Sequence, residues 1–242
     1  MRMCSPEIPN IQSLYRAALT LSILWVFGVS GLQKSWADAI HPKTDDAYQA
    51  ITGDSTDEDR NRWDAVFSTN DYIYGKEPAA FLKANISLLP VGRALDLAMA
   101  EGRNAVFLAK KGFKVDGVDI SDAALRKARR LAREQNVSIQ TINADLRTYQ
   151  IKPNSYDVII NIQFLERKLF PQIKKGLKSG GVVMIENDTE EQLKNPSGKT
   201  MSKEFLLTKG ELREVFKDFK ILFDRETNDG KEAVARFIAK KP

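Results

Sequence analysis

The sequence predicts an α/β fold: a doubly wound, seven-stranded, mostly parallel sheet that ends in a C-terminal antiparallel hairpin. Two observations lead to this fold class. Short β-branched apolar runs alternate with helical stretches, and two strand-like runs near the C-terminus are separated by Asn-Asp-Gly at 228–230, a strong hairpin signal. The chain has 242 residues and is 43% hydrophobic, enough to bury one sizeable core. We therefore expect a single main domain.

The first five predicted strands are apolar and β-branched, as strands buried inside a parallel sheet are. They cover residues 93–98, 113–120, 137–145, 156–162 and 181–187. The helices expected between them cover residues 104–111, 123–135 and 166–178. Ser121 and Asp122 fit the N-cap of the second helix, and Gly180-Gly181 is expected to stop the third. Strand and helix repeated in this order imply right-handed crossovers.

The last part of the chain departs from this alternation. Residues 211–219 have a helical pattern, and 220–227 and 232–241 are the two strand-like runs of the hairpin. The preceding insertion, Thr189–Gly210, is polar and contains Gly and Pro, which predicts a mobile lid over the site.

Residues 1–39 are predicted to be a signal peptide or a membrane anchor. Arg2 and Arg16 precede an apolar run at 17–31, and Ala37 and Ala39 form the small-x-small pattern of a cleavage site. The segment would contact the membrane or the export machinery, and either interpretation exports the rest of the chain. An anchor of opposite orientation would leave the domain on the cytoplasmic face, and a buried helix is a further alternative. Residues 40–61 are polar and acidic and predict a linker before a domain at 62–242.

Composition excludes several kinds of site. The net charge of +5 comes from Lys and Arg spread along the chain rather than clustered, so nucleic acid is an unlikely partner. The single cysteine, Cys4, and the single histidine, His41, both precede the predicted domain. An intrachain disulfide framework is therefore excluded, and no metal site is expected.

Several motifs together carry a family resemblance. ALDLAMAEGRNAVFLA, GVDIS, ADL, YDVIIN and LKSGGVVMIE follow one another in an order that resembles the class I S-adenosylmethionine-dependent methyltransferases. WDAVFSTNDYIYGKEPAAFL and FLERKLFPQIKKGLKSGG are similar to the small methyltransferases related to tellurite-resistance proteins. The resemblance spans Trp63 to Pro242. It implies a Rossmann-like methyltransferase fold, S-adenosylmethionine as cofactor and a small-molecule substrate.

The resemblance also implies where the cofactor binds, in the crevice at the carboxyl ends of the strands. Asp119 would accept hydrogen bonds from the ribose hydroxyls, Asp145 would receive the adenine amino group, and Asn161 would lie nearest the transferring methyl. The N-terminus of the first helix would accept the methionine carboxylate. The whole candidate set is Tyr74, Asp96, Ala98, Ala100, Gly102, Asn104, Asp119, Ile120, Asp145, Leu146 and Asn161. Each also has a structural interpretation: aspartates commonly cap turns after strands, and Tyr74 and Phe164 suit a core or a lid.

Relatives carry D-x-G-x-G-x-G at the first turn, where this chain has Asp96, Ala98, Ala100 and Gly102. If either alanine has to adopt a left-handed backbone, it costs about 1–2 kcal/mol. Micromolar cofactor affinity corresponds to about 8 kcal/mol. We therefore expect the cofactor pocket to be retained.

The predicted domain contains neither cysteine nor histidine, which excludes covalent attack of the cytosine C5 type and leaves the catalytic residue unassigned. Residues 161–164 lack the paired prolines of base-amino methyltransferases. We therefore expect S-adenosylmethionine-dependent transfer to a small acceptor, such as a thiol or a chalcogen oxyanion. The alternative is a non-catalytic exported or membrane-anchored binding module with a degenerate fold, because the cofactor is made in the cytoplasm.

Overall fold

The computed structural model describes residues 56–196, 198 and 201–242. The predicted signal peptide or anchor at 1–39 lies outside the described residues, as does most of the predicted linker. Within the described ranges, no helix is both long and apolar enough to cross a membrane.

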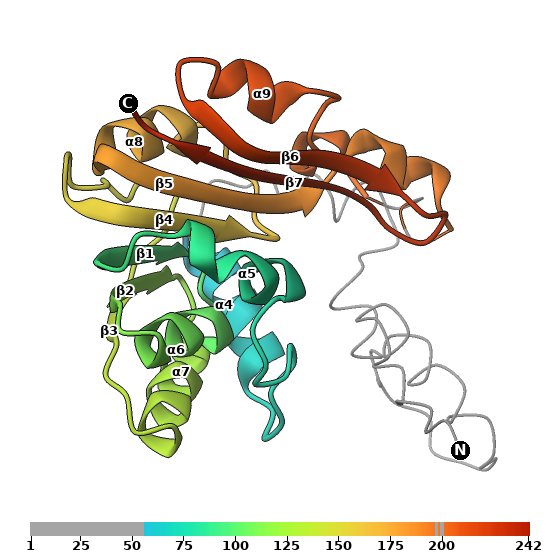
Figure 1. The fold of residues 1–242 in the computed structure, drawn as a ribbon. Coiled ribbons are helices and arrows are strands. Elements are labelled where there is room, and N and C mark those ends of the chain that lie inside the picture. Colours follow the sequence, from blue (N-terminus) through green and yellow to red (C-terminus); the bar gives the residue numbers. More distant parts are fainter. Residues whose placement is uncertain (1–55, 197, 199–200) are drawn as a thin grey trace, which may run out of the picture. The chain divides into compact units, whose positions relative to one another are not determined.

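The seven-stranded sheet is confirmed, with strand order β3-β2-β1-β4-β5-β7-β6 (Figure 1). The five parallel strands are β1 (Arg93–Leu97), β2 (Lys114–Asp119), β3 (Gln140–Asn143), β4 (Tyr156–Ile162) and β5 (Leu177–Asp188). β7 (Ala233–Lys240) is antiparallel to both β5 and β6 (Lys220–Asn228). The antiparallel hairpin therefore closes the parallel sheet as the sequence predicts.

Helices cover both faces of the sheet, which is the doubly wound arrangement. They are α4 (Thr56–Phe67), α5 (Ala80–Asn85), α6 (Arg103–Lys110), α7 (Asp122–Glu134), α8 (Leu169–Gly176) and α9 (Glu211–Val215). One large apolar cluster contains Leu82 of α5 and Leu108 of α6, and another contains Ile173 of α8 and Leu212 of α9. The N-cap of α7 is confirmed, because the Ser121 side chain accepts a hydrogen bond from the amide of Ala124.

Several boundaries differ from the sequence expectation. β3 and α9 are shorter than the predicted 137–145 and 211–219, and β5 is longer than the predicted 181–187. Two further differences have a clear physical reason. α4 begins at Thr56, inside the predicted linker at 40–61, and its acidic first turn suits the positive end of the helix dipole. α8 ends at Gly176, and Gly180 and Gly181 lie inside β5 instead of stopping the helix. Gly180 has a φ of +76°, and the pairing of β4 with β5 shifts register in this region. The glycine pair therefore belongs to a strand irregularity.

The part of the insertion that the structure describes is attached to the end of β5. The Leu207 amide donates to the Asp188 carbonyl at 2.9 Å, and Leu206 and Leu207 are buried. Two short 3-10 helices, Glu190–Lys194 and Lys203–Phe205, lie between Asp188 and Leu206 in the chain. This attachment holds one end of the predicted lid against the sheet.

Candidate functional site

The turn after β1 has the backbone of a glycine-rich turn although two of its residues are alanine. Ala98 has a φ of 54°, Ala100 a φ of 49° and Gly102 a φ of 82°. All three lie in the left-handed region, where a Cβ is disfavoured. A Cβ on Gly102 would also lie 2.7 Å from the Cβ of Ala128 in α7. The chain therefore keeps the geometry of the turn at the expense of strain at both alanines.

Asp119 holds this turn to the end of β2. Its carboxylate accepts hydrogen bonds from the amides of Ala100 at 2.8 Å and Ser121 at 2.9 Å. Burial raises the pKa of Asp119, and the two backbone hydrogen bonds oppose that rise. The residue thus fixes the turn as well as occupying the predicted ribose position, so removing its carboxylate also affects the fold. The neighbouring Ile120 is half-buried, and its carbonyl accepts from Asn143 at 2.9 Å.

Asp96 and Asn161, at the ends of β1 and β4, carry buried polar atoms with no partner among the described residues. These atoms are Oδ2 of Asp96 and both Oδ1 and Nδ2 of Asn161. The side chains are only 2% and 1% exposed. Buried polar atoms in native proteins are nearly always hydrogen-bonded, so these orphaned atoms fit a site that a polar ligand completes.

The Asp96 carboxyl is unusual electrostatically as well. Burial, followed by the neighbouring Asp119 charge, raises its pKa to about 8, while the Arg103 charge and the Ala105 amide act in the opposite direction. The group therefore holds a proton at neutral pH. A cationic ligand group placed against its free oxygen would lower the pKa and release that proton.

The Asp145 carboxylate has hydrogen-bond partners within the protein that the sequence did not predict. Its carboxylate accepts from the Arg147 side chain, with the shortest contact at 2.7 Å, and from the Thr56 hydroxyl of α4 at 2.9 Å. Burial raises the pKa of Asp145, but these hydrogen bonds outweigh burial and leave it lowered. Leu146, predicted to border the adenine, is packed in the core with its side chain 6% exposed.

α4 lies over the ends of β2 and β3. Besides the contact from Thr56, its Asp64 accepts from the Ser121 hydroxyl at 2.6 Å and from the Ala123 amide at 2.9 Å. Arg147 also forms an ion pair with Asp59 at 3.1 Å. A helix that begins inside the predicted linker therefore covers the side of the site where the adenine half of the cofactor is expected.

Two other predicted residues have structural contacts. The Asn104 side-chain oxygen accepts from the Ala79 amide at 2.9 Å, which ties α6 to the segment before α5. The Tyr74 amide donates to Glu101 at 3.2 Å, and the Tyr74 ring lies under the Arg103 guanidinium at 5.7 Å.

Sequence reasoning missed Arg103, the first residue of α6. Its guanidinium donates to the Tyr74 carbonyl at 3.2 Å, and burial lowers its pKa. The charges of Tyr74, Asp96, Glu186 and Glu101 all act on it. Because it is a half-buried cation beside the helix N-terminus, Arg103 is suited to bind a carboxylate there. The signal was present, since Arg103 lies between Gly102 and Asn104 in the same motif.

A buried ion pair was missed as well. Glu101, in the turn after β1, pairs with Lys127 of α7 at 2.6 Å, and both side chains are less than a tenth exposed. Lys127 also donates to the Asp71 carbonyl, and Glu101 accepts the Tyr74 amide. The pair therefore joins the turn, α7 and the segment that carries Tyr74.

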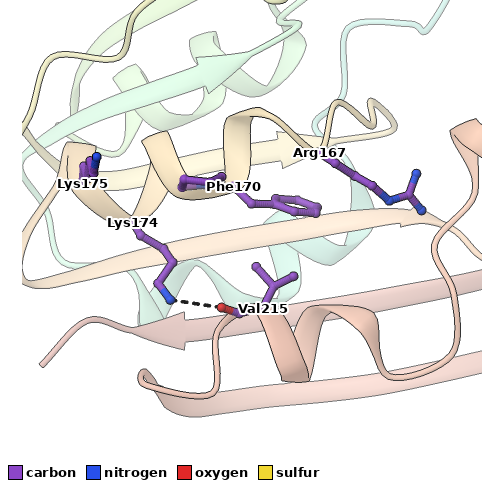
Figure 2. Close-up of a pocket in the computed structure, with 6 residues that line it drawn as sticks. Arg167, Phe170, Lys174, Lys175 and Val215 are labelled. Carbon is purple, nitrogen blue, oxygen red and sulfur yellow. Dashed lines mark hydrogen bonds between the residues drawn. The ribbon is translucent and has the colours of Figure 1, made fainter.

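A separate open hollow of about 530 Å³ lies between α8 and α9 (Figure 2). The Lys174 ammonium donates to the Val215 carbonyl there at 3.1 Å. The residues lining this hollow are Arg167, Phe170, Pro171, Lys174, Lys175 and Val215. None of them belongs to the predicted cofactor set, so the hollow is not the candidate site.

Comparison with known proteins agrees with this geometry. A family model described as a methyltransferase domain matches residues 94–181. A probable S-adenosyl-L-methionine-dependent methyltransferase TehB of Haemophilus influenzae is 27% identical over 139 residues, covering 54% of this chain and 46% of the relative. A carboxy-S-adenosyl-L-methionine synthase of Nautilia profundicola is 30% identical over 101 residues, covering 38% of this chain and 43% of the relative. The chain thus spans less than half the length of these two curated relatives.

The crystal structure of TehB from Haemophilus influenzae superposes with a TM-score of 0.57 at 22% identity, covering 67% of this chain and 61% of TehB. The superposition shows a methyltransferase fold, and the matched methyltransferase domain lies within it. In sequence and in fold, the chain is similar to TehB.

Proposed function

We propose that this protein transfers a methyl group from S-adenosylmethionine to a small acceptor. The observation that carries the proposal is the turn after β1. Ala98 and Ala100 adopt left-handed backbone angles that glycine would adopt without strain, and Asp119 holds the turn by a hydrogen bond to Ala100. Strained backbone of this kind is concentrated at functional sites, so two strained alanines in one turn indicate that the turn has a function.

The residues at the strand ends suit the chemical groups of the cofactor. Asp119 would accept the ribose hydroxyls, and Arg103 with the amide-rich start of α6 would hold the methionine carboxylate. The free oxygen of Asp96 would bind the methionine ammonium. The carboxamide of Asn161 would lie beside the methyl group. Asp145 would receive the adenine amino group, with Thr56 giving up its hydrogen bond.

When bound, S-adenosylmethionine supplies an electrophilic methyl group on a sulfonium. Methyl displacement depends mainly on alignment and on exclusion of water. The strand ends fix the direction of approach, and α4 covers the side of Asp145 and Asp119. The resemblance points to a thiol or a chalcogen oxyanion as the small acceptor.

We also propose that residues 1–39 act as an export signal or a membrane anchor, joined by residues 40–55 to the domain. The support is the apolar run at 17–31 with its flanking arginines. The intact mass of the protein recovered from its native host tests this assignment, because cleavage after Ala37 or Ala39 shortens the chain by a defined mass. A full-length mass with no membrane association would contradict it.

The test of the proposed function is transfer of a labelled methyl from S-adenosylmethionine to the small-molecule fraction of a cell extract. Wild-type protein is expected to form S-adenosylhomocysteine and a labelled small product. Asp119→Asn is expected to lower the rate at subsaturating cofactor about tenfold or more, because charge-assisted hydrogen bonds are weakened. Asp122→Asn, an exposed aspartate three residues away, is the matched control and should retain wild-type rates. No labelled product at any cofactor concentration would refute the proposal.

A further inference from the structure

A second open hollow, of about 310 Å³, lies between α7 and the chain at Phe67–Thr69, where α4 ends. Four cationic side chains of α7 line it, and no acidic side chain does. The four are Arg126, Lys127, Arg130 and Arg133. None of the lining residues belongs to the candidate cofactor set, so this hollow is separate from the site at the strand ends.

The arginines of the hollow belong to a row along the exposed face of α7. All alanines and leucines of this helix are buried, whereas the arginines are exposed at positions 126, 129, 130 and 133. Residues three and four apart are neighbours on a helix surface, and like charges at this spacing repel each other. The two acidic residues of α7, Asp122 and Glu134, lie at its ends and do not line the hollow. The row is therefore unfavourable unless an anion neutralises it.

Neighbouring groups leave most of this positive charge uncompensated. Among the described residues, the side chains of Arg126 and Arg133 form no hydrogen bond or ion pair. Glu134 lies 3.7 Å from Arg130 and 2.7 Å from the Lys76 ammonium, so one carboxylate is shared between two cations. The hollow therefore has an excess of positive charge.

Part of the cationic wall is already fixed in position. The Arg130 guanidinium donates to the Tyr72 hydroxyl at 3.3 Å and to the Asn70 carbonyl at 3.4 Å. Lys127 is nearly buried, and its charge is neutralised by Glu101 at 2.6 Å, so the arginines supply the net charge. A side chain that is held before the ligand arrives loses less conformational entropy on binding. The hollow is thus partly organised for an anion in advance.

We infer that this hollow binds a small soluble compound through a phosphate or diphosphate group, which Arg126, Arg130 and Arg133 hold. A guanidinium presents its donors in a fork that matches phosphate oxygens. A phosphate monoester carries about two negative charges near neutral pH, so it neutralises several cations at once. A volume of about 310 Å³ lies at the lower end for ligand pockets, which suits a small molecule. The inference goes beyond the proposed methyl transfer, because it concerns a different site.

The lining favours a small molecule over a nucleic acid or a membrane. Single-stranded nucleic acids stack their bases on aromatic side chains. Phe67, the aromatic residue of the lining, is only 3% exposed and offers no such surface. A membrane or a long polyanion would contact the whole row, including Arg129, which lies outside the hollow. Arg126 and Arg129 therefore distinguish binding inside the hollow from binding along the helix.

The first test is calorimetric titration of the full chain with inorganic pyrophosphate at low ionic strength. Wild-type protein is expected to show one saturable site. Arg126→Gln should weaken binding about tenfold, because it removes one of the three arginines from the hollow. Arg129→Gln is the matched control, since it removes the same charge from the same helix outside the hollow, and its affinity should stay within about twofold of wild type. Equal weakening in both variants, or no saturable binding by wild type, overturns the inference.

Both variants are expected to fold, because each replaced side chain is exposed and each substitution relieves repulsion within the row. Thermal unfolding without ligand checks this. Added pyrophosphate should raise the Tm of wild type and of Arg129→Gln, and that of Arg126→Gln by less. Arg133→Gln is a second variant inside the hollow with the same expectation as Arg126→Gln. A Tm shift of the same size in all four proteins contradicts the assignment.

Other ligands test the chemistry of the anion and its source. Succinate, a dicarboxylate, should bind about tenfold more weakly than pyrophosphate, and equal affinity would contradict the assignment to phosphate. Vesicles of phosphatidylglycerol and a single-stranded oligonucleotide test the two macromolecular partners. If either binds in a way that Arg126→Gln and Arg129→Gln weaken alike, while pyrophosphate does not bind, the row serves a membrane or a nucleic acid and the inference is wrong.

The outcomes separate this site from the proposed function. Arg126→Gln is expected to bind S-adenosylhomocysteine as wild type does, because the hollow shares no residue with the candidate cofactor set. Loss of pyrophosphate binding with normal S-adenosylhomocysteine affinity thus assigns Arg126 to the hollow alone. A variant that loses both affinities together would contradict two separate sites.

Discussion

Replacing Ala98 or Ala100 with glycine should stabilise the protein. Each alanine holds a left-handed φ, 54° and 49°, which costs an L-residue about 1–2 kcal/mol relative to glycine. Glycine also increases the entropy of the unfolded chain, which costs about 0.5–1 kcal/mol. The difference is a net stabilisation on the order of 1 kcal/mol per site. For a domain of this size, that raises Tm by about 2–4 °C.

The measurement is urea and thermal unfolding of Ala98→Gly, Ala100→Gly and the double variant. Ala109→Gly in α6 is the matched control, because Ala109 has an ordinary helical backbone and glycine there should cost about 1 kcal/mol. The reasoning is refuted if the two turn variants lose stability as the control does. The strain is present both with and without ligand, so relieving it does not by itself change cofactor affinity. Affinity should rise only to the extent that removing the two methyl groups widens the turn.

Three further changes test the site. The pKa of Asp96 in the folded protein, about 8, lies above the ordinary value of 3.8 for this carboxyl group. The free energy of unfolding of wild type should therefore fall relative to that of Asp96→Asn as pH rises from about 4 to about 8, by up to about 1.4 kcal/mol per pH unit. A difference between the two that does not vary with pH in urea unfolding contradicts this. Lys127→Met should destabilise the protein by about 3–5 kcal/mol, because it leaves the buried Glu101 carboxylate without its partner charge. Adding Glu101→Gln should recover much of that loss. Equal stability of the single and double variants in chemical denaturation would argue against a buried pair. Gly102→Ala should lower both Tm and cofactor affinity, since its Cβ would meet Ala128, and an unchanged Tm would show that α7 moves away freely.

The fold was predictable because its signals are local. Buried parallel strands are continuous apolar runs, and the hairpin has its turn residues in sequence, so the fold class followed from pattern alone. Boundaries were less predictable where a tertiary contact decides them. α4 begins in a polar stretch without clear periodicity, and its contacts from Thr56 to Asp145 and from Asp64 to Ser121 join residues far apart in the chain.

The residues of the candidate site that lie at strand ends could be predicted from the sequence. The side chains that pair between different helices and turns could not. Asp96, Asp119 and Asn161 follow from the rule that ligands bind at the carboxyl ends of parallel strands. The pairing of Glu101 with Lys127 had no signal, because each residue alone fits an exposed helix or turn.

Calorimetric titration of the full chain with S-adenosylhomocysteine tests the central claim most directly. We predict one saturable site with a Kd in the micromolar range, about 8 kcal/mol of binding free energy, weakened by Asp119→Asn and unchanged by Asp122→Asn. A folded wild-type protein that shows no saturable binding would contradict the assignment of the strand ends as a cofactor site.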